Sequence, residues 1–142
     1  MISLNGESLA YLGDSIYEAK IREHILSSGY QDVNKLHKLA VRFTSGESQA
    51  KIVEYLLKNE VLSEEEITYY KRGRNSSHSK NRRSISVGSY KMATGFEALV
   101  GYLYLSGKND RLSELLQLII KIVEERLLWT KKQITKSIIV KG

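Results

Sequence analysis

The sequence predicts a domain built only from α-helices. Its 142 residues contain no proline, the residue that most strongly interrupts a helix. Apolar residues recur every three or four positions through most of the chain, as they do on the buried face of a helix, and no segment alternates like a half-buried strand. We therefore expect one helical domain over residues 1–130, followed by a tail over residues 131–142 whose structure is left unassigned.

Three helices are predicted in the first part of the chain. The first covers about residues 8–27 and ends before Gly29, a residue type common just after helix ends. Asp32 can cap the second helix, and the third begins near Ser45. The predicted inward-facing residues are Leu9, Leu12, Ile16 and Ala19 in the first helix, Val33, Leu36 and Ala40 in the second, and Ala50, Val53, Leu56 and Leu57 in the third.

Three more helices are predicted in the second part. Ser63 and Glu66 form the pattern S-x-x-E, a capping box, which opens a helix through Tyr70. The next helix stops at Gly107, and Asn109 or Asp110 can cap the last one. The predicted inward-facing residues are Phe96, Leu99, Val100 and Leu103 in the fifth helix, and Leu112, Leu115, Ile119 and Val123 in the sixth.

The composition indicates an intracellular globular domain. Cysteine is absent, which excludes disulfides and thiolate metal sites, and the three histidines match no zinc pattern. No apolar run approaches the roughly 18 residues that span a bilayer, and the first residues lack the blocks of a secretory signal. We therefore expect a cytoplasmic location and no membrane partner.

The net charge of +6 is concentrated in one segment. No acidic residue lies between Glu66 and Glu97, whereas seven Lys and Arg do, so the other residues together carry −1. The segment is also rich in Ser, Gly and Asn, which favours an irregular loop over residues 71–91. A basic loop of this kind suits contacts with phosphate groups, although a solvated loop without a partner has the same composition.

Two carboxylates stand in apolar surroundings, Asp14 in LAYLGDSIY and Glu97 in ATGFEALVGYLYL. An ionised carboxylate among apolar residues is costly unless a positive charge compensates it, and Mg²⁺ held by one or two carboxylates would do so. Glu18 lies one helical turn after Asp14 and is expected to face the same site. Gly13 and Gly101 would let the two helices pack closely. The alternative is that each carboxylate pairs with an Arg or caps a helix.

The two segments together resemble the motifs of the ribonuclease III family. LAYLGDSIYE is similar to its signature helix and FEALVGYLYL to its second acidic motif, E-A-L-x-G, with the same order and an intervening basic loop. LHKLAVRFTSGESQA and KRGRN extend the likeness over nearly the whole chain. The best-fitting branch is Mini-ribonuclease III, which has the all-α nuclease domain and no double-stranded-RNA-binding domain.

The resemblance implies a metal-dependent endoribonuclease that cleaves double-stranded RNA and leaves a 5′-phosphate and a 3′-hydroxyl. Asp14 matches the metal-binding Asp of the signature motif and Glu97 the essential Glu of the second motif, so both would hold Mg²⁺, or Mn²⁺ as its substitute. Longer members carry two further acidic residues where this chain has Ala10 and Thr94. The site is therefore expected to be more open to water. Glu7 matches another acidic position and is given a supporting role.

The resemblance also implies partners. Family members form homodimers, and Tyr11 and Tyr17 are candidates for the dimer surface or, equally, for the core. The usual substrate of the short branch is the precursor of large-subunit (23S) ribosomal RNA, which makes a large-subunit ribosomal protein a candidate partner. The residues expected to bind RNA are Lys71, Arg72, Arg74, Lys80, Arg82 and Arg83.

Two other functions are compatible with the sequence. With Ala10 and Thr94 in place of two acids, the chain could be a non-catalytic helical module that binds structured RNA. A DNA-binding helical protein has less support because no helix-turn-helix pattern is found. The presence of Asp14 and Glu97 in settings that otherwise have no use for them favours the nuclease.

Overall fold

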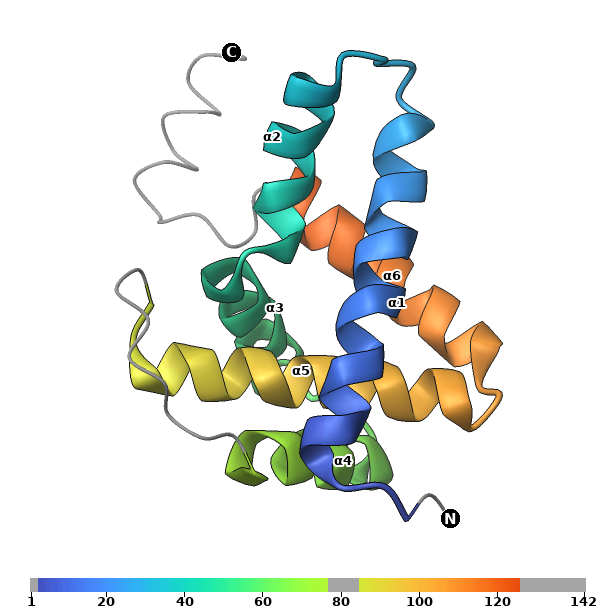
Figure 1. Ribbon diagram of the computed structural model, residues 1–142. Helices are drawn as coiled ribbons and strands as arrows, with labels where there is room; N and C mark the ends of the chain where they lie inside the picture. Colours follow the sequence, from blue (N-terminus) through green and yellow to red (C-terminus); the bar gives the residue numbers. More distant parts are fainter. Residues whose placement is uncertain (1–2, 77–84, 126–142) are drawn as a thin grey trace.

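The computed structural model describes residues 3–76 and 85–125, and within these ranges it consists of six α-helices without any strand (Figure 1). The helices are α1 (Gly6–Leu26), α2 (Val33–Thr44), α3 (Gly46–Lys58), α4 (Glu64–Ser76), α5 (Val87–Leu105) and α6 (Asn109–Glu124). The predicted all-α fold is confirmed. None of the described helices is long and apolar enough to cross a membrane. The tail over residues 131–142 lies outside the described ranges.

Several helix starts follow from capping side chains. The Ser45 hydroxyl accepts a hydrogen bond from the backbone N–H of Ser48 at the start of α3. The predicted capping box opens α4: the Ser63 N–H donates to Glu66 Oε1 (2.9 Å), and the Glu66 N–H donates to Ser63 Oγ (3.1 Å). The start of α6 differs from the prediction, because Lys108 precedes the helix and Asn109 is already its first residue. Local hydrogen bonds thus account for helix ends to within a few residues.

Helix α5 runs through the middle of the domain, and α1, α3, α4 and α6 all pack against it (Figure 1). Nine of its 19 residues are buried, on more than one face. A helix that is apolar nearly all round is expected at the centre of a helical fold. Because α5 contacts four other helices, it can bring its side chains together with those of several elements.

Helices α4 and α5 occupy both ends of the segment that we expected to be irregular, residues 71–91. Helix α4 continues to Ser76 because Tyr69, Tyr70 and Gly73 are buried, and an added Cβ at Gly73 would lie 2.4 Å from the Ala98 Cβ on α5. At the other end, α5 begins directly after its capping residue, Ser86. The expected loop is therefore shorter, and its first basic residues lie on a helix.

The buried face of α1 also differs from the prediction. Leu9 is buried as expected, but Leu12 and Ile16 are only half-buried and Ala19 is exposed. The buried face instead passes through Gly13 and Tyr17. The closest approach of α1 to α5 is at a glycine, so the packing and not the apolar stripe sets the orientation of the helix.

One charged pair joins α4 and α6, with Glu66 buried and Arg111 half-buried. Arg111 donates from Nε to Glu66 Oε2 (2.8 Å) and from a terminal nitrogen to Glu66 Oε1 (2.9 Å) and to the Val61 carbonyl oxygen (2.7 Å). Burial alone would raise the pKa of Glu66, but hydrogen bonds from Arg111 and Ser63 lower it below its ordinary value. This pair fixes the start of α6 against α4.

Candidate active site

Asp14 and Glu97 come together where α1 crosses α5. A Cβ added to Gly13 would lie 1.7 Å from the Glu97 carbonyl oxygen, and a Cβ added to Gly101 would lie 2.1 Å from the Leu9 carbonyl oxygen. The two helices therefore contact each other backbone to backbone, as the two glycines predicted. Because Asp14 follows Gly13 directly, this crossing brings it beside Glu97.

A cavity of about 420 Å³ lies beside this crossing and is lined by both predicted carboxylates. Asp14 comes from α1, Glu97 and Thr94 from α5, and Glu47 and Gln49 from α3. Thr44, the last residue of α2, also lines it, so residues from four helices surround one space. The position where longer family members were expected to carry an acid, Thr94, is part of this lining.

The cavity carries negative charge. Asp14, Glu47 and Glu97 line it, and no Lys or Arg is found among its described lining residues. An RNA phosphate would be repelled by three carboxylates unless a cation neutralises them. No three His, Cys, Asp or Glu among the described residues are close enough to hold a metal by themselves. The donor set therefore fits an ion such as Mg²⁺, which takes one or two carboxylates and completes its shell with water and phosphate oxygens.

The structure changes the reason for singling out Asp14. Its side chain is exposed and Glu97 is half-buried, so neither is an ionised carboxylate inside an apolar core. The apolar neighbours of Asp14 in the sequence point to other sides of α1. What distinguishes the two residues is the shared cavity and not their burial.

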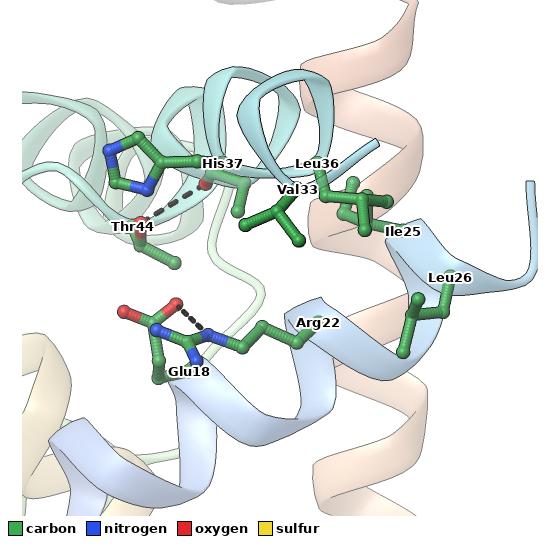
Figure 2. Close-up of a pocket in the computed structure, with 9 residues that line it drawn as sticks. Glu18, Arg22, Ile25, Leu26, Val33, Leu36, His37 and Thr44 are labelled. Atoms are coloured by element: carbon green, nitrogen blue, oxygen red, sulfur yellow. Dashed lines mark hydrogen bonds and ion pairs between the residues drawn. The ribbon is translucent and has the colours of Figure 1, made fainter. Parts of the chain in front are cut away.

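The two supporting acidic residues do not line this cavity. Glu18 lies instead in a neighbouring cavity of about 230 Å³ between α1 and α2, where it pairs with Arg22 at 3.4 Å (Figure 2); Thr44 lines both cavities. Glu18 therefore lies one turn further along α1, against α2, and is not among the described residues that line the cavity of Asp14. Glu7 is exposed in the first turn of α1 and is absent from the described lining of either cavity.

The two tyrosines of α1 have opposite environments. Tyr17 is a core residue: its hydroxyl donates to the Phe43 carbonyl oxygen (2.9 Å) and its ring packs edge-on against Phe96. Burial raises the pKa of Tyr17 well above its ordinary value. Tyr11, three residues before Asp14, is 86% exposed. Of the two dimer candidates, only Tyr11 is available to a partner.

The described basic residues of α4 also differ from one another. The Arg72 guanidinium lies 4.6 Å from the centre of the Tyr69 ring and donates to the Leu4 carbonyl oxygen (3.4 Å). Arg74 lies over Tyr70 and donates to the Asn75 side chain. Lys71 is exposed. The two arginines therefore help to pack α4, while Lys80, Arg82 and Arg83 lie outside the described residues.

Sequence reasoning missed two residues of the cavity, Glu47 and Gln49. A signal for Gln49 was present, because residues 49, 52, 53 and 56 fall on one face of α3 and the other three are apolar. A polar residue at a buried helical position needs a hydrogen-bonding partner. Glu47 lies near the capped start of α3, where acidic residues are common because they interact favourably with the helix dipole. The sequence therefore did not mark it as a site residue.

Comparison with known proteins shows extensive similarity. The family model described as the Ribonuclease III domain matches residues 7–108. The chain is 44% identical over 122 residues to Mini-ribonuclease 3 of Enterococcus faecalis, covering 86% of this chain and 92% of that protein. It is 45% identical over 122 residues to Mini-ribonuclease 3 of Acholeplasma laidlawii, covering 86% and 96%. The crystal structure of protein FN1578 from Fusobacterium nucleatum is similar with a TM-score of 0.75 and 32% identity, covering 84% of this chain and 93% of that one.

Proposed function

Since this chain belongs to the ribonuclease III family and is an endoribonuclease, we propose that it cleaves double-stranded RNA with a divalent cation held by Asp14 and Glu97. The observation that carries the proposal is the crossing of α1 and α5 at Gly13 and Gly101. It brings two carboxylates from distant parts of the sequence to one cavity. Two carboxylates in an anionic cavity are suited to hold Mg²⁺, or Mn²⁺ in its place.

The side chains of the cavity have distinct tasks in this proposal. Asp14 and Glu97 supply anionic oxygens that fix the position of the cation against the walls of the cavity. When bound, the cation supplies Lewis-acid polarisation of the phosphate and lowers the pKa of a bound water. Water adds to phosphorus as the bond to the 3′ oxygen breaks, so the products carry a 5′-phosphate and a 3′-hydroxyl.

Removal of divalent cations tests this function. We expect a labelled RNA duplex to be cut in Mg²⁺, to remain intact in excess EDTA, and to be cut again when Mg²⁺ is restored. A DNA duplex of the same sequence is the control and should remain intact in all three conditions. Cleavage at an unchanged rate in EDTA would remove the role of the cation, and preferential binding of the DNA would favour the DNA-binding interpretation.

The proposed cellular substrate is the precursor of large-subunit (23S) ribosomal RNA, and its support is the similarity to Mini-ribonuclease 3 proteins. In the same assay, a transcript carrying the paired ends of that precursor should be cut at discrete positions. A generic duplex of equal length should be cut more slowly. Adding large-subunit ribosomal proteins shows whether one of them stimulates the reaction. Equal rates on both RNAs would argue against a dedicated ribosomal substrate.

The basic stretch that begins on α4 and continues after it is proposed to bind the RNA backbone through Lys71, which lies on α4, and through Lys80, Arg82 and Arg83. Replacing all four with Gln should weaken duplex binding, and the logarithmic salt dependence should become shallower by roughly 0.9 for each phosphate that the protein no longer neutralises. The matched control replaces four exposed lysines on other helices, Lys20, Lys38, Lys58 and Lys121. Arg72 and Arg74 are left unchanged because they pack on tyrosines. An unchanged salt slope would show that the segment does not bind RNA.

The active form is proposed to be a homodimer with Tyr11 in its interface. A tyrosine that is 86% exposed, three residues before Asp14 and on a helix similar to the family signature, is available for such a contact. Tyr11→Asp should shift the mass in solution, measured by light scattering, from dimer to monomer. Tyr104→Asp on α5, where the tyrosine is also exposed, is the control. A monomeric wild type would contradict this part of the proposal.

A further inference from the structure

Gln49 is a buried polar residue whose side-chain amide is only partly used. It is 3% exposed, and its Nε2 donates to the carbonyl oxygen of Thr44 (3.2 Å). Its Oε1 accepts no hydrogen bond from any described residue. Yet no fully enclosed side-chain nitrogen or oxygen of the described residues lacks a partner. Oε1 is therefore not fully enclosed, and the described cavity that Gln49 lines is the one that holds Asp14 and Glu97.

Glu66, the other buried polar residue among those described, differs from Gln49 in how its side-chain oxygens are hydrogen-bonded. Glu66 is held by Arg111 and Ser63, so both of its oxygens have partners within the fold. No described residue donates a hydrogen bond to Oε1 of Gln49 in this way, so the partner that this oxygen needs has to come from a molecule in the cavity. A buried acceptor that faces an active-site cavity is thus placed to bind something that enters this cavity.

The chemistry of the cavity indicates which molecule the Gln49 side chain binds there. Asp14 and Glu97 can provide only part of an octahedral shell, so a cation held by them keeps several water molecules. Those waters donate hydrogen bonds and are oriented by acceptors around the metal. Glu47 also lines the cavity, but its side chain is 69% exposed and lies 3.8 Å from Lys51. Gln49 offers the buried acceptor, and its position is fixed by the hydrogen bond to Thr44.

Resting on the proposed function, we propose that Gln49 is a positioning residue of this site, whose Oε1 accepts a hydrogen bond from a water bound to the cation. A neutral acceptor orients the water without adding a fourth carboxylate to a cavity that must also admit a phosphate. Gln49 shares the cavity with Thr94, which occupies the position of an acid in longer members of the family. A water held by Gln49 fills part of the shell that this acid would otherwise occupy.

Two substitutions separate this role from a structural one. Gln49→Leu removes both the acceptor and the donor. Gln49→Glu keeps acceptor oxygens but cannot donate to the Thr44 carbonyl. Binding of Mn²⁺ is measured without RNA, from the paramagnetic resonance signal of the free ion. We expect Gln49→Leu to bind Mn²⁺ about 10- to 100-fold more weakly than wild type and Gln49→Glu to bind it at least as tightly as wild type.

The controls are Gln117→Leu and Gln117→Glu, the same changes at an exposed position on α6, and both should bind Mn²⁺ as wild type does. Urea unfolding in EDTA verifies that each variant is folded, and Gln49→Met replaces the Leu variant if that one is not. Wild-type affinity in the Leu or Met variant would overturn the inference. Equal weakening in the Leu and Glu variants would also overturn it, because the hydrogen bond to Thr44 would then explain the effect.

The failure of this inference is distinguishable from failure of the proposed function. If the wild type binds Mn²⁺ and loses it on Asp14→Asn, while Gln49→Leu binds normally, only the role of Gln49 is removed. If the wild type binds no Mn²⁺ and cleaves no duplex, the proposed function and the role of Gln49 are both overturned.

Discussion

Replacing Asp14 with Asn, or Glu97 with Gln, is expected to slow cleavage of duplex RNA by about 1,000-fold or more. Each change exchanges an anionic oxygen for a neutral amide of nearly the same shape and removes one of the two carboxylates proposed to hold the cation. Loss of charge stabilisation of about 4 kcal/mol in the transition state corresponds to a factor of that size. Asp14 is exposed and Glu97 is half-buried beside a cavity, so both variants should fold.

The rate is best measured in a single turnover with excess protein, so that product release does not contribute. Duplex binding is measured separately and should be retained, because the basic segment is unchanged. Glu18→Gln is the matched control on α1. Since Glu18 lies in the other cavity and pairs with Arg22, its loss should change the rate less than about threefold, in line with an exposed ion pair of small energy. An Asp14→Asn variant as fast as the control would exclude Asp14 from the reaction. A chain that binds duplex RNA tightly but does not cut it with any divalent metal would instead favour the non-catalytic RNA-binding module.

Gly13→Ala is expected to destabilise the domain by roughly 2 kcal/mol or more. The new Cβ would lie 1.7 Å from the Glu97 carbonyl oxygen, and because this atom belongs to a helix backbone, it cannot rotate away. Forcing extra volume into packed helices costs about 1–3 kcal/mol and occasionally more. The better helix propensity of Ala returns only about 1 kcal/mol. The steric clash therefore outweighs the gain in helix propensity, and the net change is destabilising. It is measured as the free energy of unfolding in urea.

Gly88→Ala is the matched control for this prediction. Gly88 lies in the first turn of α5, and a Cβ added there meets no atom within 4 Å. The same change should therefore be neutral or stabilising by up to about 1 kcal/mol. Equal stability of the Gly13 and Gly88 variants would mean that α1 and α5 are not in backbone contact. Because Gly13→Ala must also displace Glu97, its folded fraction should cleave RNA more slowly.

Local patterns in the sequence were sufficient to predict the six helices and several of their ends. The Ser63–Glu66 capping box is formed, and the inward-facing residues of the last helix, from Leu112 to Val123, are buried. Such features depend on hydrogen bonds and side chains within a few residues of one another, so the sequence determines them directly. The resemblance that joined Asp14 to Glu97 also rested on two short motifs.

The composition of the site was decided only by the tertiary structure. Helix α1 turns its Gly13 face to α5, which leaves Ala19 exposed and places Glu18 against α2. The apolar face of α3 marks Gln49 as a buried polar residue, but only the tertiary structure shows that the start of α3, with Gln49 and Glu47, lies at the same cavity as Asp14. The physical reason is that a cavity is formed where helices cross. The crossing point depends on how closely two backbones can approach, and this depends on contacts between residues that are far apart in the sequence.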